Sequence, residues 1–250
     1  VAAAGRNAAR GAPDVALFEV GQIFLGDGED DQRVAAAGLR RGTAKAGGAG
    51  RAWDGAAGPV GVFDAKADAL ALMAALGINP AAVQTVPGGP AWLHPGRSLT
   101  FRMGPKVTIG SCGEIHPEVL RAFDGSGPVA AFEIVLDALP PSKARPTKAR
   151  PRLVLSDLQP VERDFAFLID RSVAAADVAG AAQGADRALV AGAAVFDVYE
   201  GKGVPEGKKS VAVAVTLQPK DRTLAEADIE TVSRRIVEAV AKKTGGALRG

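Results

Sequence analysis

The sequence predicts an α+β protein of two domains, each built from antiparallel strands and helices. Of its 250 residues, 47% are apolar and 23% are charged, which is typical of a folded globular chain with room for two domains. A proline-rich basic segment interrupts the chain at residues 143–152. The residues after that segment follow the order strand, helix, strand, strand, helix, strand. These three observations predict the fold class.

The first domain, residues 1–142, is expected to hold an antiparallel sheet with helices packed against it. Strands are predicted at Val15–Leu25 and Val34–Arg41, on either side of an acidic turn. Further along, the pattern predicts a helix at Asp64–Gly77 with Leu70, Met73 and Leu76 on one side, a hairpin from Leu99–Met103 to Lys106–Gly113, a short helix after His116-Pro117 and a strand at Val129–Leu136. The Gly- and Ala-rich residues Gly42–Gly58 are typical of a loop. More than one strand order fits this pattern.

The segment at 143–152 predicts an extended linker. It carries five positive charges and no negative charge, and its prolines disfavour helix. The first domain has 12 Lys/Arg and 14 Asp/Glu, and residues 153–250 have 13 and 14. The basic excess therefore lies in the linker, and the two domains themselves are close to neutral.

The second domain, residues 153–250, shows a clearer pattern. Strands are predicted at Phe165–Ile169, Val195–Tyr199 and Ser210–Leu217, and Ala247–Arg249 is expected to form an edge strand. One helix is expected to run from a cap at Ser172 to Gln183, and a second to begin at a capping box from Thr223 to Glu226 and to end at Gly245-Gly246. The second helix has a core-facing stripe of Ile229, Val232, Ile236 and Val240.

This β-α-β-β-α-β order is that of a ferredoxin-like fold, with both helices on one face of a four-stranded sheet. Alternation along the strands predicts which side chains face the helices: Phe165, Phe167, Phe196, Val198 and the series Val211, Val213, Val215 and Leu217. On the uncovered face we expect Ala166, Leu168, Asp197, Tyr199, Ser210, Ala212 and Ala214.

Few residues suggest catalysis or metal binding. Cys112, Glu114, His116 and His94 lack the paired spacing of zinc sites, and a strand Cys and a turn-forming His-Pro are the simpler interpretation. Ser111 has no nucleophile-elbow sequence around it. Gly207-Lys208-Lys209-Ser210 superficially matches a phosphate loop, but a strand rather than a helix follows it.

Tyr199, the chain's single tyrosine, is the most informative residue by position. It is expected on the uncovered face beside small residues, with Asp197 and Ser210 nearby. A flat surface with one aromatic ring and hydrogen-bonding neighbours suits a stacked nucleic-acid base. The alternative is that Tyr199 covers the sheet against another domain.

Several motifs resemble a known family. Arg163-Asp164-Phe165-Ala166, Val195–Gly201, Pro205–Ser210 and Arg222-Thr223-Leu224 are similar, in order and spacing, to the ferredoxin-fold anticodon-binding domain of the bacterial phenylalanine–tRNA ligase beta subunit. Asn7–Arg10, Phe18–Phe24, His94–Ser98 and Gly113–Pro117 resemble that subunit's class II synthetase core-like domain. The resemblance covers essentially the whole chain and identifies it as the C-terminal region of such a subunit.

The resemblance implies a division of labour. In the α2β2 ligase the alpha subunit activates phenylalanine with ATP and magnesium, and the degenerate core-like domain of beta packs against alpha. Active cores carry an ATP-binding Arg in a strand that here reads Phe18-Glu19-Val20-Gly21, and the late Gly-x-Gly-x-x-Arg motif does not occur. The isolated chain is therefore expected to be inactive, with no catalytic residue, no metal ligand and no cofactor of its own.

The resemblance also implies the site and the partners. Ala166, Asp197, Tyr199 and Ser210 match the positions that contact the tRNA(Phe) anticodon, with Tyr199 stacking a base, Asp197 and Ser210 hydrogen-bonding base edges and Ala166 allowing close approach. Glu162 stands where the family often has a basic residue. Expected partners are the alpha subunit and tRNA(Phe). No membrane span or signal peptide is expected, and the single Cys112 fits a reducing cytoplasm. The alternative function is a stand-alone ferredoxin-like ligand-binding or interaction module.

Overall fold

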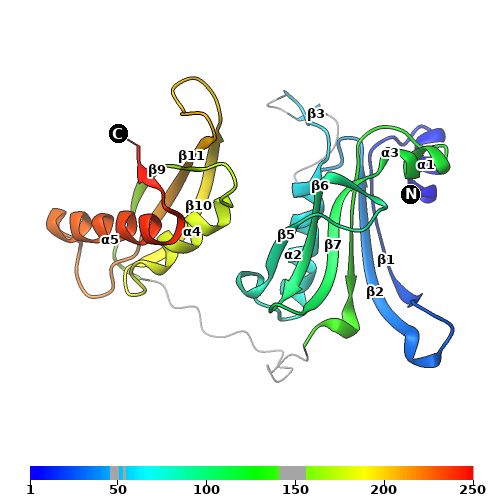
Figure 1. Ribbon diagram of the computed structural model, residues 1–250, viewed down its shortest axis with the longest axis horizontal. Coiled ribbons are helices and arrows are strands. Elements are labelled where there is room, and N and C mark those ends of the chain that lie inside the picture. The colour runs from blue at the N-terminus through cyan, green and yellow to red at the C-terminus, as the bar shows by residue number, and fades with distance from the viewer. Residues whose placement is uncertain (46–50, 53–54, 141–155, 250) are drawn as a thin grey trace. The chain divides into compact units, whose positions relative to one another are not determined.

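The chain folds into two compact units, unit 1 (Val1–Lys148) and unit 2 (Ala149–Gly250). The structure is a computed structural model that describes residues 1–45, 51–52, 55–140 and 156–249. Each unit has its own sheet and its own hydrophobic core (Figure 1). The predicted linker at 143–152 lies outside the described residues.

Unit 1 is built on a six-stranded antiparallel sheet in the order β1-β2-β8-β7-β6-β5. Its strands are β1 (Val15–Phe24), β2 (Gln32–Arg41), β5 (Gln84–Pro87), β6 (Leu93–Met103), β7 (Val107–Ile115) and β8 (Val129–Val135), and its helices are α1 (Ala2–Ala9), α2 (Val62–Ala75) and α3 (Pro117–Ala122). The predicted antiparallel sheet is confirmed, and β1 forms one of its edges. Helix α1 and strand β5 were not expected from the pattern.

The segment predicted as a loop at Gly42–Gly58 contains one short ladder. Strand β3 (Arg51–Ala52) pairs with β4 (Gly55–Ala56), while residues 46–50 and 53–54 lie outside the described residues. The loop prediction is therefore corrected only at these four paired residues.

Helix α2 covers one face of the unit 1 sheet. Its buried side chains are Ala65, Ala69 and Met73, which recur every four residues, so that small side chains bring the helix close to the strands. The predicted stripe was partly wrong, because Leu76 is 43% exposed at the helix end. The helix also begins two residues earlier than predicted, where the Asp64 carboxylate accepts a hydrogen bond from the Gly61 N–H at 2.8 Å.

Unit 2 has the predicted ferredoxin-like order. It comprises β9 (Val161–Asp170), α4 (Ala175–Gly184), β10 (Val190–Tyr199), β11 (Lys208–Leu217), α5 (Glu226–Thr244) and β12 (Ala247–Leu248). The four strands form an antiparallel-paired sheet in the order β10-β11-β9-β12, so β12 is the edge strand that the sequence predicts. Gly245 ends α5 in the left-handed conformation (φ 67°).

The core of unit 2 lies between one sheet face and the two helices. The side chains of Val211, Val213, Val215 and Leu217 are fully buried, as the alternation along β11 predicts. On α5, Val232, Ile236 and Val240 are buried and Ile229 packs against them. This confirms the predicted stripe, and no helix of the described residues covers the opposite face of the sheet.

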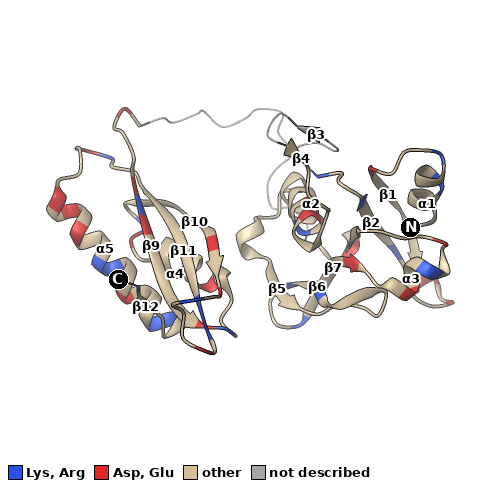
Figure 2. Ribbon diagram, turned by 90° about the horizontal axis from the view of Figure 1, so that it is seen from above, with Lys and Arg blue, Asp and Glu red and all other residues tan. Residues whose placement is uncertain are grey.

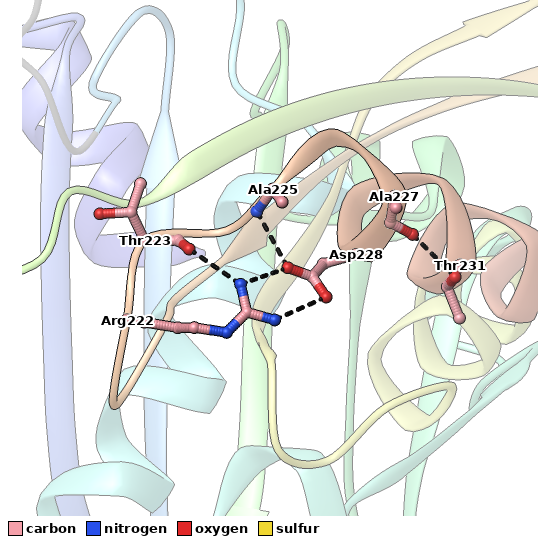
Figure 3. A network of polar contacts seen from close by, with 6 residues as sticks. All are labelled: Arg222, Thr223, Ala225, Ala227, Asp228 and Thr231. Atoms are coloured by element: carbon pink, nitrogen blue, oxygen red, sulfur yellow. Dashed lines mark hydrogen bonds and ion pairs between the residues drawn. The ribbon is translucent and has the colours of Figure 1, made fainter.

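The start of α5 is capped by a different side chain from the one predicted. The helix begins at Glu226 after Ala225, so Thr223 lies outside it. The carboxylate of Asp228 accepts a hydrogen bond from the Ala225 N–H at 2.9 Å and binds the Arg222 guanidinium through two contacts of 2.7 and 2.9 Å (Figure 3). The Arg222 hydrogen bonds, followed by the Ala225 N–H, hold the pKa of Asp228 below its usual value.

The predicted cap of α4 was also wrong. The helix begins at Ala175, three residues after Ser172. Both the N–H and the hydroxyl of Ser172 instead donate to the Asp170 carboxylate, at 2.9 and 2.6 Å, in the turn that follows β9. A serine that binds the preceding aspartate in this way stabilises a turn rather than a helix end.

Candidate nucleic-acid interface

The four predicted site residues lie together on the helix-free face of the unit 2 sheet, which we call the open face. Asp197 pairs with Ala212, and Ala212 pairs with Ala166. Tyr199 pairs with Ser210 in the next row of the same face. Residues that pair directly across antiparallel strands point to one side of the sheet, so the structure brings all four into two adjacent rows.

A β-bulge in β10 sets which residues reach this face. The pairing shifts between Val195, which pairs with Val213, and Asp197, which pairs with Ala212. The additional residue is Phe196. It was predicted to face the helices, but it is 58% exposed, and Val198 is 46% exposed. The prediction failed for Phe196 because simple alternation does not foresee a bulge. Val198 pairs with the buried Val211 and so keeps the predicted face, but it is exposed because β10 is an edge strand.

The ring of Tyr199 is positioned by the loop that follows β10. Its hydroxyl donates a hydrogen bond to the Lys202 carbonyl at 3.3 Å, and 41% of the residue is exposed. A Cβ atom at Gly201 would lie 2.7 Å from the Tyr199 Oη and 2.8 Å from its Cζ, closer than such contacts occur. Because Gly201 has no side chain, the Tyr199 ring can lie against it. In this position the ring is partly exposed beside the open face.

Polar contacts fix the loop that carries Gly201. The Glu200 carboxylate pairs with the Arg171 guanidinium at 2.7 Å, and the Gly201 carbonyl accepts from the Val204 N–H at 3.0 Å. Lys209 donates to the Arg171 carbonyl at 2.9 Å. These contacts join the loop to the turn after β9. The loop next to Tyr199 is therefore fixed both by its own backbone hydrogen bond and by the contacts with that turn.

The other residues of the open face differ in access. Asp197 is exposed, and its carboxylate can accept hydrogen bonds from the N–H groups of a base edge. Ala166 and Ala212 are half-buried and present only methyl groups, which permits close approach of a flat ligand. Ser210 is 5% exposed, so it is the least accessible of the predicted residues.

One residue of this face was missed at the level of sequence. The Arg249 N–H donates to the Ala166 carbonyl at 2.7 Å, one step beyond the β12 pairing of Leu248 with Phe167. Its guanidinium reaches the loop after β10, where its Nη2 would lie 3.6 Å from a Cβ at Gly203. The edge strand was predicted, but the sequence pattern carries no signal for where the long side chain at its end would reach.

Charge elsewhere in unit 2 is largely balanced. Both signs occur along α5, as Figure 2 shows, and several of its charged residues are paired. The Arg235 guanidinium binds Asp186 at 2.7 Å, and Lys243 binds Asp177 at 3.3 Å. The paired charges therefore do not make this part of unit 2 a strongly basic surface.

The other candidate residues of the sequence have structural roles. Cys112 is buried in unit 1, and burial raises the pKa of its thiol to about 12. The Nδ1 atoms of His94 and His116 accept hydrogen bonds from the N–H groups of Gly96 and Glu118, at 3.1 and 3.2 Å. In the part of the chain that the structure describes, no three His, Cys, Asp or Glu side chains gather as metal ligands, and no helix has the length and hydropathy to cross a membrane.

Unit 1 exposes a different kind of surface. Edge strand β1 and the turn after it carry exposed apolar side chains, with Phe18 85%, Val20 55%, Phe24 68% and Leu25 67% exposed. A hollow of about 370 Å³ lies next to Phe18 and is also lined by Gly38, Leu72 and Phe132. A free strand edge with apolar side chains of this size is typical of a surface that another polypeptide covers.

Comparison with known proteins gives two family matches along the chain. The family described as phenylalanyl tRNA synthetase beta chain CLM domain matches residues 1–136, and the ferredoxin-fold anticodon binding domain matches residues 156–249. Both agree with the resemblance that the motifs indicate.

Curated relatives agree with these matches. The chain is 55% identical over 249 residues to the phenylalanine–tRNA ligase beta subunit of Bradyrhizobium diazoefficiens, and 52% identical over 250 residues to that of Mesorhizobium japonicum. Each match covers 100% of this chain but 31% of the relative, so the chain spans about a third of their length. A solved structure of the pyrrolysyl tRNA synthetase PylSc of Desulfitobacterium hafniense matches with a TM-score of 0.37 and 13% identity, covering 53% of this chain and 42% of that one, which is too distant to support an argument.

Proposed function

The chain belongs to the phenylalanyl tRNA synthetase beta chain family, and from this premise we propose that unit 2 recognises the anticodon of tRNA(Phe) on its open face. In this proposal Tyr199 stacks on a base, Asp197 accepts hydrogen bonds from base edges, and Ala166 allows the RNA to approach the sheet. Ser210 forms a hydrogen bond to a base edge through the 5% of its surface that is exposed.

The observation that carries the proposal is the placement of Tyr199. Its ring is exposed beside small residues, and the loop holds it through Gly201 and the Lys202 carbonyl. A ring fixed in this way has already lost its rotational freedom, so less entropy is lost when a base stacks on it. Stacking of a base on an aromatic side chain contributes ~1–3 kcal/mol.

We propose that unit 1 binds the alpha subunit of the ligase and has no catalytic residue of its own. The exposed apolar side chains of β1 support a protein partner at this edge. In the proposal ATP and magnesium act in the alpha subunit, as the family resemblance implies.

The proposal keeps the domain limits expected from the sequence: a core-like domain at 1–142, a basic linker at 143–152 and the anticodon-binding domain at 153–250. Its second half agrees with the family match at 156–249. A tRNA partner also fits the cytoplasmic location that the sequence predicts.

The test is a pair of substitutions in the complete α2β2 ligase. Tyr199→Ala should weaken tRNA(Phe) binding by ~1–3 kcal/mol, because it removes the stacked ring. Tyr199→Phe should retain most of the affinity, because it keeps the ring and loses only the 3.3 Å hydrogen bond to Lys202. Phenylalanine activation without tRNA should be unchanged in both variants.

Melting temperature separates this role from a packing role. If Tyr199 only covers the sheet, the Ala variant should melt at a lower temperature and lose tRNA affinity only as folded protein is lost. Unchanged affinity in a fully folded Tyr199→Ala ligase would remove Tyr199 from the binding site.

A further inference from the structure

We propose that Arg249 is a phosphate-binding residue of the open face and contacts the backbone of the RNA whose base stacks on Tyr199. This inference rests on the proposed function, because it adds a backbone contact to the same site. Neither the motifs nor the family matches assign a role to this residue.

The position of Arg249 follows from the pairing of the last strand. Ala247 and Leu248 of β12 pair with Leu168 and Phe167 of β9, and the next step of that register is the hydrogen bond from Arg249 to Ala166. Arg249 therefore shares the face of Ala166, which is the open face. Its backbone is held by the sheet, so only the side chain has to adapt to a ligand.

The side chain extends to the loop that holds Tyr199. The Arg249 Nη2 would lie 3.6 Å from a Cβ at Gly203, and Gly203 is two residues after Gly201, against which the tyrosine ring rests. The guanidinium and the ring therefore border the same loop. In the proposal, a phosphate that flanks the base stacked on the ring lies within reach of the guanidinium.

The charge of Arg249 is available for a ligand. Among the described residues no carboxylate lies within ion-pair distance of it, whereas Arg171, Arg222 and Arg235 are paired with Glu200, Asp228 and Asp186. The residue is half-buried, so its charge is less screened than that of a fully exposed side chain. A planar guanidinium with five N–H donors binds phosphate in a bidentate way.

The experiment measures tRNA(Phe) binding by the complete ligase over a range of salt concentrations. Each phosphate contact to single-stranded RNA adds about 0.7 to the slope of log K against log salt. Arg249→Gln should lower that slope by about 0.7 and weaken binding about tenfold at low salt, while Arg249→Lys should keep the slope. Melting temperature should change little, because the β12 hydrogen bond uses the backbone of Arg249.

Arg234→Gln is the matched control. Arg234 is exposed on α5, which covers the other face of the sheet, so its loss changes the net charge equally without changing the open face. An Arg249→Gln variant with the slope and affinity of Arg234→Gln would overturn the inference.

Failure of the role of Arg249 can be distinguished from failure of the proposed function of Tyr199. Tyr199→Ala should lower affinity at every salt concentration without changing the slope, since stacking releases no counterions. Loss of affinity in Tyr199→Ala with an unchanged slope in Arg249→Gln would reject only the role of Arg249. Unchanged affinity in Tyr199→Ala with a reduced slope in Arg249→Gln would retain the phosphate contact and reject base stacking.

Discussion

The two units expose their sheets to different kinds of partner. Unit 1 presents the edge strand β1 with large apolar side chains, of which Phe18 is 85% exposed. Unit 2 presents the open face of its sheet, where alanines lie beside a single tyrosine and the charged side chains include Asp197 and Arg249. Protein interfaces are dominated by buried apolar anchors, whereas single-stranded RNA is bound through stacking and phosphate contacts. The contrast teaches that the alpha subunit and the tRNA should be bound by different units.

Breaking the surface of unit 1 should have the largest effect. Phe18→Ser should weaken assembly with the alpha subunit by ~2–4 kcal/mol, the usual loss at the centre of an interface. The chain alone should keep its melting temperature, because the ring is exposed. Assembly can be followed by sedimentation of the mixed subunits.

Phe123→Ser offers a comparison, since Phe123 is 51% exposed at the end of α3 and lies off β1. Equal assembly of the Phe18 and Phe123 variants would contradict the assignment of β1 to the alpha subunit.

A smaller effect is expected at the loop that holds Tyr199. Gly201→Ala should displace the ring, because the new Cβ would lie 2.7 Å from the Tyr199 Oη. A side chain forced from its preferred rotamer costs ~0.5–1.5 kcal/mol, and tRNA affinity should fall by a similar amount. Binding of tRNA(Phe) to the complete ligase measures this loss.

Gly192→Ala is the control for Gly201→Ala. Gly192 lies on β10, the strand that carries Tyr199, and a Cβ at this position meets nothing within 4 Å. In a Tyr199→Ala background the Gly201 substitution should have no further effect on affinity. Equal affinities of the two glycine variants would show that Gly201 does not position the ring.

The smallest effect is expected on the helix side of unit 2 and should spare tRNA binding. Asp228 binds Arg222 and caps α5, and its pKa is lowered in the folded state. A lowered pKa contributes stability above the pKa of the unfolded chain, and this contribution is lost as the pH falls through the folded value. Asp228→Asn should therefore lower the melting temperature at pH 7, and the difference should close in acid.

Asp221→Asn removes an exposed carboxylate that makes no ion pair among the described residues, so it controls for net charge. A gap in melting temperature that persists unchanged into acid would rule out the ionised Asp228 as its source. A change in the tRNA affinity of Asp228→Asn would contradict the proposal that tRNA binds only the open face and not the helix side of unit 2.

The sequence predicted the parts of the fold that depend on periodic burial. The alternation along β11 and the stripe on α5 identified the core of unit 2, because both elements bury one face only. It also placed Asp197 and Tyr199 on the open face. The helix starts were wrong at Ser172 and Thr223, because Asp170 binds Ser172 in a turn and Asp228 accepts the hydrogen bond from the Ala225 N–H at the start of α5. Caps depend on local geometry that composition does not fix.

The strand order of unit 1, the bulge at Phe196 and the reach of Arg249 could not be predicted for a related reason. Each depends on which strand lies next to which, and pairing partners far apart in the chain leave no periodic signal. The bulge in particular shifts the register by one residue, which alternation within a single strand cannot reveal.

Tyr199 has a practical consequence because no other tyrosine occurs in the chain. Protein made with isotope-labelled tyrosine gives NMR signals from one ring in 250 residues. That ring touches Gly201 and lies on the open face, so its chemical shifts report on this surface alone and need no assignment of the rest of the spectrum. Titration with an RNA hairpin would then follow the occupancy of one side chain directly.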